Sequence, residues 1–312
     1  MMPHSFTSPL AHTYSIVARD PATGDMGVAV QSHWFSVGSL VTWAEAGVGA
    51  IATQAFVNAS FGPHGLELLR LGLSAPEAVN TLIAADDGRE VRQLAIVDSQ
   101  GQVAAHTGRN CIPAAGHHLG DNYAVQANLM LNEQVWPAMA AAFESSRGPL
   151  AERLVATLAA AQAVGGDIRG QQSAALLVVS GVSTGEIWQD RLIELRIEDH
   201  PQPVTELQRL LQIHRAYEYM NRGDEAMERN DVAGALEAYR LAEALYSDNP
   251  EMKFWHAVSL ANAGQVKAAL PMFQEIFSQD RLWASLLARL PAVGLLRITP
   301  GDLATILNRS ES

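Results

Sequence analysis

The first 200 residues alternate between short apolar, β-branched runs and longer stretches in which apolar residues recur at helical spacing. Residues 13–19 and 26–32 are runs of the first kind. The Asp, Pro and Gly between them are typical of a turn, which predicts a β-hairpin. A second hairpin is predicted over residues 93–106, because Asp98 and Gly101 separate two such runs. Further strands are predicted at 48–53, 123–128, 174–179 and 191–197.

Two pairs of helices are predicted between these groups of strands. Residues 66–73 carry leucines at helical spacing, and Ser74 with Glu77 has the spacing of a capping box that opens a second helix. Apolar residues recur every four positions over residues 135–143 and again over residues 150–158. Strands and helix pairs in this order favour antiparallel sheets with separate helix layers over a doubly wound parallel sheet. The sequence therefore predicts an α+β fold.

A change of pattern divides the chain near residue 200. Pro201 and Pro203 hold the chain extended, and a helical pattern starts directly after them. We therefore predict an N-terminal extension, an α+β domain, a linker and a helical domain, over residues 1–12, 13–198, 199–203 and 204–312 respectively.

The helical domain repeats itself at an offset of 34 residues. Ala235 and Tyr239 recur as Ala269 and Phe273. A small residue four positions before an aromatic residue, at this period, is typical of tetratricopeptide helix pairs. Two chance amphipathic helix pairs are the alternative, and Pro271 lies inside a predicted helix. Such repeats stack into concave surfaces that bind a protein or peptide, although they also serve as packing extensions or dimer surfaces.

Composition and charge exclude several classes of partner. The chain has 33 acidic and 21 basic residues and a net charge of −12, whereas binding to nucleic-acid backbones requires a basic surface. No apolar run approaches the ~20 residues needed to cross a bilayer, and the N-terminus has no secretory signal pattern. The single cysteine, Cys111, excludes an internal disulfide framework and suits a reducing compartment. We expect a cytoplasmic protein that binds neither nucleic acid nor membrane.

Known cofactor and metal motifs are missing from the sequence. The ten histidines include no HExxH or similar ligand spacing, and the chain lacks the glycine-rich loops that bind phosphates or dinucleotides. Cys111 could act as a nucleophile only with a histidine nearby in space, and a lone thiol is more often part of the core. We therefore expect no metal and no cofactor.

Uncharged polar residues gather at the ends of predicted strands. Hydroxyl and amide side chains in such places suit recognition of amide or acyl groups by hydrogen bonding. Ordinary polarity of turns and strand edges is the alternative, and composition alone favours it. The clusters are Ser32 with His33, Thr53 with Gln54, Gln126 to Asn128, and the loop over residues 165–173.

Five segments of the α+β domain are distinctive as a set. They read TYSIVARD, GVAVQS, WAEAGVGA, QANLM and GGDIRGQQSAA, at residues 13–20, 27–32, 43–50, 126–130 and 165–175. Together they resemble a bacterial family of unknown function in the N-terminal-nucleophile (Ntn) hydrolase superfamily, the superfamily of proteasome subunits and penicillin acylases. The resemblance covers about residues 12–200 in order.

The resemblance implies a four-layer αββα sandwich, which agrees with the predicted order of strands and helix pairs. In the superfamily the mature chain begins at Thr, Ser or Cys, and this residue supplies both the nucleophile and, through its α-amine, the base. A free α-amine titrates near ~7.7–8.0 and can accept the hydroxyl proton, whereas an amide nitrogen cannot. Many family members begin Met-Thr-Phe-Ser, and the position of their threonine is Thr13 here.

This chain departs from the superfamily pattern in two ways. Twelve residues precede Thr13, so Thr13 gains its base only if the chain is cut after His12. The catalytic lysine of the proteasome has no counterpart, because both lysines of this chain, Lys253 and Lys267, lie in the helical domain.

Two functions are compatible with these observations. In the first, the protein is an amidohydrolase or acylase that cleaves a small amide or acylated amino compound, with Thr13 as nucleophile and Asn128 as oxyanion donor. In the second, the αββα domain is a non-catalytic scaffold whose helical repeats bind a protein or peptide. We expect a homo-oligomer. In the first hypothesis the residues that line the substrate site are Ser32, His33, Glu45, Gln54, Asp167 and Arg169.

Overall fold

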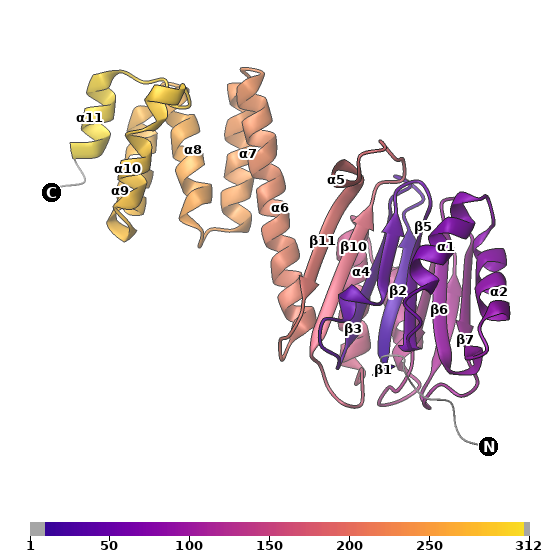
Figure 1. Cartoon of the computed structure of the whole chain (residues 1–312). Coiled ribbons are helices and arrows are strands. Elements are labelled where there is room, and N and C mark those ends of the chain that lie inside the picture. The colour runs from indigo at the N-terminus through magenta and orange to yellow at the C-terminus, as the bar shows by residue number, and fades with distance from the viewer. Residues whose placement is uncertain (1–9, 309–312) are drawn as a thin grey trace. The chain divides into compact units, whose positions relative to one another are not determined.

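The computed structural model describes residues 10–308 and divides into two compact units, one up to Leu211 and one from Gln212 (Figure 1). The first unit holds both β-sheets, and the second consists of helices. The predicted α+β class is confirmed, with two antiparallel sheets followed by a helical region.

The larger sheet has six strands and carries the first predicted hairpin at its centre. Strands β2 (Thr13–Arg19) and β3 (Met26–Ser32) pair antiparallel, with Thr13 opposite Ser32. Thr13 therefore begins a central strand. The strand order is β11–β10–β3–β2–β9–β8, and the further strands are β8 (Gly116–Gly120), β9 (Tyr123–Ala127), β10 (Ser173–Val179) and β11 (Arg191–Ile197).

The smaller sheet is built on β5 (Gly49–Phe56), which pairs with β6 (Arg92–Asp98), and β6 pairs in turn with β7 (Val103–Thr107). Two short strands share the other edge of β5. One is β4 (Thr42–Glu45), and the other is β1 (Leu10–Ala11), which pairs with the last two residues of β5. The chain just before Thr13 is thus an edge strand of the smaller sheet.

The two sheets pack face to face through small and β-branched side chains. Alanine at many inward positions lets the two backbones approach closely and leaves room for polar side chains between them. Burying each valine stabilises the sandwich by about 1.5–3 kcal/mol. The fully buried contacts include Val17, Val28 and Val30 of the larger sheet and Ala50, Ala52 and Ala95 of the smaller one.

A pair of helices covers the outer face of each sheet, which gives the layers αββα (Figure 1). Helices α1 (Phe61–Arg70) and α2 (Ala75–Ala85) pack on the smaller sheet. Helices α3 (Val135–Ser145) and α4 (Leu150–Ala163) pack on the larger sheet. The predicted capping box is present at α2, where the Ser74 amide donates to the Glu77 carboxylate at 2.8 Å. Three short segments complete the unit: η1 (Val37–Ser39), η2 (Arg89–Val91) and α5 (Ile187–Asp190).

Helix α6 (Pro203–Glu228) starts where the two prolines predicted a boundary. Its first turns nevertheless belong to the first unit, because Val204, Leu207 and Leu211 are buried in the core of the larger sheet with α3 and α4. The units therefore divide after Leu211 rather than at residues 199–203.

The helical region continues as helix pairs with the predicted offset of 34 residues. Ala235 of α7 (Val232–Leu245) and Ala269 of α9 (Val266–Gln279) are fully buried, and the aromatic residues four positions later are buried beside them. Pro271 lies inside α9 without ending it. The remaining elements are α8 (Pro250–Asn262), α10 (Leu282–Leu287), η3 (Leu290–Val293) and α11 (Pro300–Asn308).

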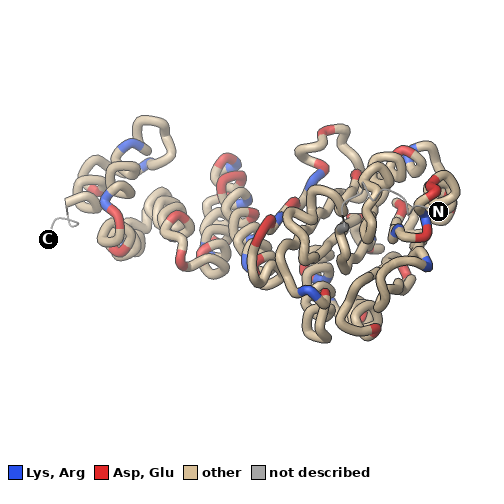
Figure 2. Tube along the Cα trace, turned by 60° about the horizontal axis from the view of Figure 1, so that its bottom comes forward, with Lys and Arg blue, Asp and Glu red and all other residues tan. Residues whose placement is uncertain are grey.

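None of the helices within residues 10–308 is long and apolar enough to cross a membrane. Figure 2 shows acidic and basic residues interspersed along the described trace, without a continuous basic stripe there.

Candidate functional site

Thr13 lies at the meeting point of three strand ends that the sequence marks as polar. Its side chain is fully buried, Ser32 is its partner in β3, and the Asn128 amide donates to the Thr13 carbonyl oxygen at 3.1 Å. Gln54 reaches it from the smaller sheet, where its side-chain nitrogen donates to the same carbonyl oxygen at 3.0 Å. Both sheets thus contribute to one buried polar cluster.

The centre of the cluster is a glutamine for which the sequence suggests no role. The Gln93 side-chain oxygen accepts hydrogen bonds from Gln54 Nε2 at 2.7 Å and from Asn128 Nδ2 at 2.8 Å. Its nitrogen donates to the carbonyl oxygen of Ala127 at 2.9 Å and to the hydroxyl of Thr107 at 2.9 Å. These buried amides form hydrogen bonds with one another in place of water. The connected network therefore holds the side chains in one geometry.

The peptide bond between His12 and Thr13 lies inside this cluster. The carbonyl oxygen of His12 accepts a hydrogen bond from Ser32 Oγ at 2.6 Å and another from Arg169 Nη2 at 2.8 Å. Two donors on one carbonyl oxygen, one of them a cation, polarise the carbonyl and favour negative charge on that oxygen.

The Thr13 hydroxyl donates to the carbonyl oxygen of Ala11 at 2.7 Å. Within residues 10–308 this is the one hydrogen bond of that hydroxyl, and the Thr13 nitrogen is a peptide amide. An amide nitrogen does not accept a proton, so the uncut chain gives Thr13 no base of its own.

The side chain of His12 fills the space beside Thr13. Its Nδ1 donates to Asn128 Oδ1 at 2.7 Å, and its ring meets Phe56 edge-on with centroids 5.6 Å apart. Burial lowers the pKa of the His12 imidazole, and the nearby Arg169 guanidinium lowers it further, while the hydrogen bond to Asn128 acts in the opposite direction. The ring is therefore uncharged at neutral pH.

Arg169 is aimed at the His12 carbonyl by a buried carboxylate. Asp167 pairs with Arg169 at 2.7 Å, and its side chain is fully buried whereas that of Arg169 is 29% exposed. Asp167 also accepts the His33 amide at 3.2 Å and bridges to Met130 through the backbone. The loop reaches this position from α4 through Gly166, whose φ of +57° suits glycine.

Two strained residues flank the cluster. Ala55 follows Gln54 with φ of +71°, and Leu129 follows Asn128 with φ of +57°. A side chain in the left-handed region costs about 1–3 kcal/mol, and such residues concentrate at functional sites. Each directly follows a residue that contacts Thr13: Ala55 lies inside β5, and Leu129 lies in the loop after β9.

The structure brings most of the predicted site residues together but leaves one outside. Ser32, Gln54, Asn128, Asp167 and Arg169 surround the His12–Thr13 peptide, and His33 enters with its backbone amide only.

Glu45, by contrast, lies at the surface at the end of β4, where both of its carboxylate oxygens accept hydrogen bonds from Arg70. The residues that the sequence reasoning missed are His12 and Gln93. Gln93 carried a weak signal as a polar residue at the start of an apolar predicted strand.

Cys111 is buried, and its thiol donates to the Arg92 carbonyl at 3.3 Å. Burial raises the pKa of the Cys111 thiol to about 11, so at neutral pH it stays protonated and unreactive. Among the described residues no group of three or more His, Cys, Asp or Glu is placed to hold a metal ion.

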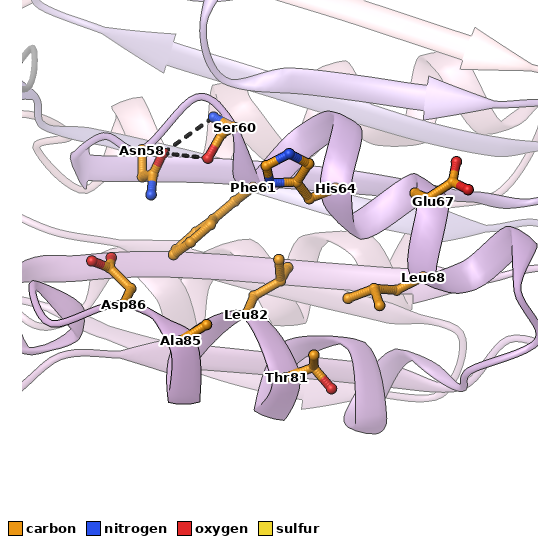
Figure 3. A pocket seen from close by; sticks show the side chains of 10 residues that line it. All are labelled: Asn58, Ser60, Phe61, His64, Glu67, Leu68, Thr81, Leu82, Ala85 and Asp86. Atoms are coloured by element: carbon orange, nitrogen blue, oxygen red, sulfur yellow. Dashed lines mark hydrogen bonds between the residues drawn. The ribbon is translucent and has the colours of Figure 1, made fainter.

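A separate surface cavity of about 420 Å³ lies between α1 and α2 (Figure 3). Phe61 and Leu82 form its apolar wall, and at one end Asn58 Oδ1 accepts hydrogen bonds from the amide and hydroxyl of Ser60. None of the residues around Thr13 lines it. Its polar groups do not converge on one point, so it offers no arrangement for chemistry.

The chain has relatives among known protein families and solved structures. Residues 13–207 match the model of a family of unknown function, DUF1028. The crystal structure of a DUF1028 protein from Silicibacter pomeroyi is similar, with 34% identity and a TM-score of 0.59 over 65% of this chain and 88% of that chain. Anbu, an ancestral β-subunit from Yersinia bercovieri, has 13% identity and a TM-score of 0.32 over 63% of this chain and 92% of that chain. No curated protein matches the sequence.

Proposed function

The chain belongs to the DUF1028 family of unknown function, and we propose that it is an amidohydrolase of the Ntn type that uses Thr13 as nucleophile and base once residues 1–12 are removed. Its substrate is a small amide or acylated amino compound. The observation that carries the proposal is the placement of the His12–Thr13 peptide in a buried polar cluster, with its carbonyl oxygen held by Ser32 and Arg169.

Removal of the extension is the first reaction in this proposal. The Thr13 hydroxyl oxygen attacks the carbonyl carbon of His12, the bond to the Thr13 nitrogen breaks, and that nitrogen takes the proton. Water then hydrolyses the resulting ester, which restores the hydroxyl and leaves a free carboxylate on His12. The products are the peptide of residues 1–12 and a chain with a free α-amine at Thr13, near ~7.7–8.0 in pKa and thus able to act as a base.

Turnover repeats the same chemistry on an external amide. The α-amine accepts the hydroxyl proton while Thr13 Oγ attacks the substrate carbonyl, and the departing amine takes that proton as the acyl ester forms. Water then releases the acid. The neutral amides around Thr13 exclude water and fix the geometry without adding charge that would have to be desolvated.

The contacts favour Ser32 and Arg169 over Asn128 as donors to the developing oxyanion. Both already donate to the carbonyl oxygen next to Thr13. The Asn128 side-chain nitrogen instead donates to Gln93 at 2.8 Å, and its oxygen accepts from His12. In this proposal Asn128 holds the start of β2 in place. It also holds His12, the residue whose carbonyl group becomes the acyl group of the ester.

The test begins with the covalent state of the chain. The full chain, made in a cell-free system with protease inhibitors, is followed by intact mass and N-terminal sequencing. We expect a product that begins at Thr13 and a released peptide that ends in His12. Thr13→Ala should stay intact and Thr13→Ser should be cut, while Ser32→Ala should slow the cut by about 10²–10³-fold. Equal cutting of Thr13→Ala would refute self-cleavage.

Activity is then measured on the cut chain with a panel of small amides and N-acyl amino acids. Thr13→Ala in a chain that begins at this position should abolish turnover, because it removes the nucleophile. Full activity of the uncut chain would contradict the proposal.

A non-catalytic scaffold is the second candidate. It is favoured by the filling of the site in the uncut chain, where His12 is buried against Asn128 and Phe56. Two results together would support it: the full chain is not cut, and a chain that begins at Thr13 hydrolyses no amide in the panel.

A further inference from the structure

The helical region contains a groove of about 580 Å³ that lies between α6 and α8 and is closed by the segment 294–297. Residues of α6 that line the groove lie 34 positions before residues of α8 that also line it. Consecutive helix pairs therefore place equivalent repeat positions in the groove. This regularity identifies the groove as a face built by the repeat, rather than an accidental gap. The corresponding residues are Tyr217 and Glu251, Asn221 and Trp255, Asp224 and Val258, and Glu228 and Asn262.

The floor of the groove is apolar and contains flexible and aromatic side chains. Met220 and Met227 of α6 and Trp255 of α8 line it, and Leu295 stands at its edge with 52% of its surface exposed. Methionine is flexible and adapts to aliphatic chains of varied shape, and tryptophan is enriched at protein interfaces, which suits a surface that receives a peptide.

The walls carry an excess of negative charge. Asp224, Glu228 and Glu251 line the groove, and Arg297 is the basic residue among its lining residues. Tyrosine hydroxyls donate to Asp224 at 2.6 Å and to Glu251 at 2.9 Å, and these bonds hold the carboxylates in place without neutralising them. The carboxylate of Glu228, the last residue of α6, makes no hydrogen bond or ion pair with any of the described residues.

We propose that this groove binds an extended, lysine- or arginine-rich segment of another protein. The aliphatic stems of the basic side chains lie on the apolar floor, and their charged ends reach Glu228 and Glu251 at the walls. An acidic segment meets like charge there. A second copy of this chain is a poor occupant, because the chain carries a net charge of −12 and would bring like charge to the acidic walls.

The experiment uses the full chain and three labelled peptides that differ only in charge. Fluorescein-labelled Lys-Leu-Lys-Leu-Lys-Leu-amide is compared with versions in which Glu or Gln replaces each Lys, by fluorescence anisotropy at low and high salt. We expect the lysine peptide to bind most tightly, the glutamate peptide not to bind, and high salt to weaken the binding.

Variants locate the binding within the molecule. Glu228→Gln with Glu251→Gln should weaken binding of the lysine peptide about three- to twentyfold, because an exposed carboxylate and a half-buried one each contribute modestly. Glu237→Gln is the matched control, since Glu237 pairs with Arg240 on α7 and does not line the groove. Leu295→Ser tests the apolar edge, should also weaken binding, and leaves the buried core unchanged.

Three results would overturn the proposal. They are equal affinity for the lysine and glutamate peptides, an effect of Glu237→Gln as large as that of the groove variants, and no binding of the lysine peptide at 1 mM. Dimerisation of the chain that the peptide reverses would assign the groove to a second copy and would also overturn it. None of these outcomes depends on whether Thr13 is a nucleophile.

Discussion

The cluster around Thr13 and the groove of the helical region use polar residues in opposite ways. Around Thr13 the side chains are buried and hydrogen-bonded to one another, and the Gln93 side-chain oxygen accepts from both Gln54 and Asn128. In the groove the carboxylates stand at the walls, and Asp224 and Glu228 are exposed. The first arrangement fixes one geometry, as chemistry requires, and the second leaves a surface that a flexible partner can neutralise.

Removing an amide from each region gives the sharpest test of this difference. Gln93→Leu removes the acceptor that Gln54 and Asn128 share and also the donor to the Ala127 carbonyl oxygen, and we expect a loss of about 2–5 kcal/mol of unfolding free energy. Asn221→Leu is the matched change in the groove, where the side chain is exposed, and should alter stability by less than about 0.5 kcal/mol. Urea unfolding of both variants measures the contrast, and equal losses would show that the cluster is not a connected network.

Packing in the helical region is tested by Ala269→Leu. Ala269 is fully buried at a helix contact beside Phe273, so a larger side chain should cost about 1–3 kcal/mol. The neighbouring Ala268 is exposed, and Ala268→Leu should leave the melting temperature nearly unchanged. An unaltered melting temperature in Ala269→Leu would contradict the placement of the repeat.

The buried imidazole of His12 makes the uncut chain sensitive to acid. Because the pKa of His12 is lowered in the folded chain, the unfolded chain binds more protons below about pH 6.5, and stability falls as the pH falls. The slope from this residue is at most about 1.4 kcal/mol per pH unit. Thr13→Ala, which stays uncut, is unfolded in urea between pH 7.5 and 5 with and without His12→Gln. An identical pH dependence in the two chains would remove His12 as the cause.

The smallest effect is expected at Glu45. Its ion pair with Arg70 is well exposed on both sides, and such pairs contribute about 0–1 kcal/mol, toward the low end here. Glu45→Gln should leave both stability and the cut at Thr13 nearly unchanged, whereas Asp167→Asn should slow the cut because it releases Arg169 from its aimed position. The intact mass of each variant, followed over time, measures the rate of the cut. A much slower cut in Glu45→Gln would show that Glu45 belongs to the site.

Local patterns in the sequence predicted the elements whose signals are themselves local. The turn at residues 20–24 and the capping box at Ser74 depend on residues close in sequence, and both are present in the structure. The 34-residue repeat was found in the same way, because each copy is a local pattern of a small residue four positions before an aromatic one. Strands β1, β4 and β8 were not predicted. They are short, with two, four and five residues, and none is a β-branched apolar run. The partner of β1 lies about 45 residues away in the chain, whereas β4 and β8 each pair with the next strand.

Among the site residues, the sequence best predicted those that lie at the ends of strands. Ser32 and Asn128 end strands on either side of β2, so their meeting at Thr13 follows once the sheet order is known. Gln93 contacts them from the other sheet, and only the packing of the two sheets brings it there. Glu45 ends β4, but its side chain points to Arg70 at the surface, an orientation that no local pattern specifies.

The short strand β1 also protects an edge. Leu10 and Ala11 occupy the backbone hydrogen-bonding groups at the end of β5, opposite Phe56 and Ala55. If the chain is cut after His12 and this strand departs, this edge of β5 loses its partner strand. An open edge of that kind recruits any extended backbone within reach. The loss of twelve residues would therefore change how the protein associates, and freshly cut chains should be the most prone to self-assembly.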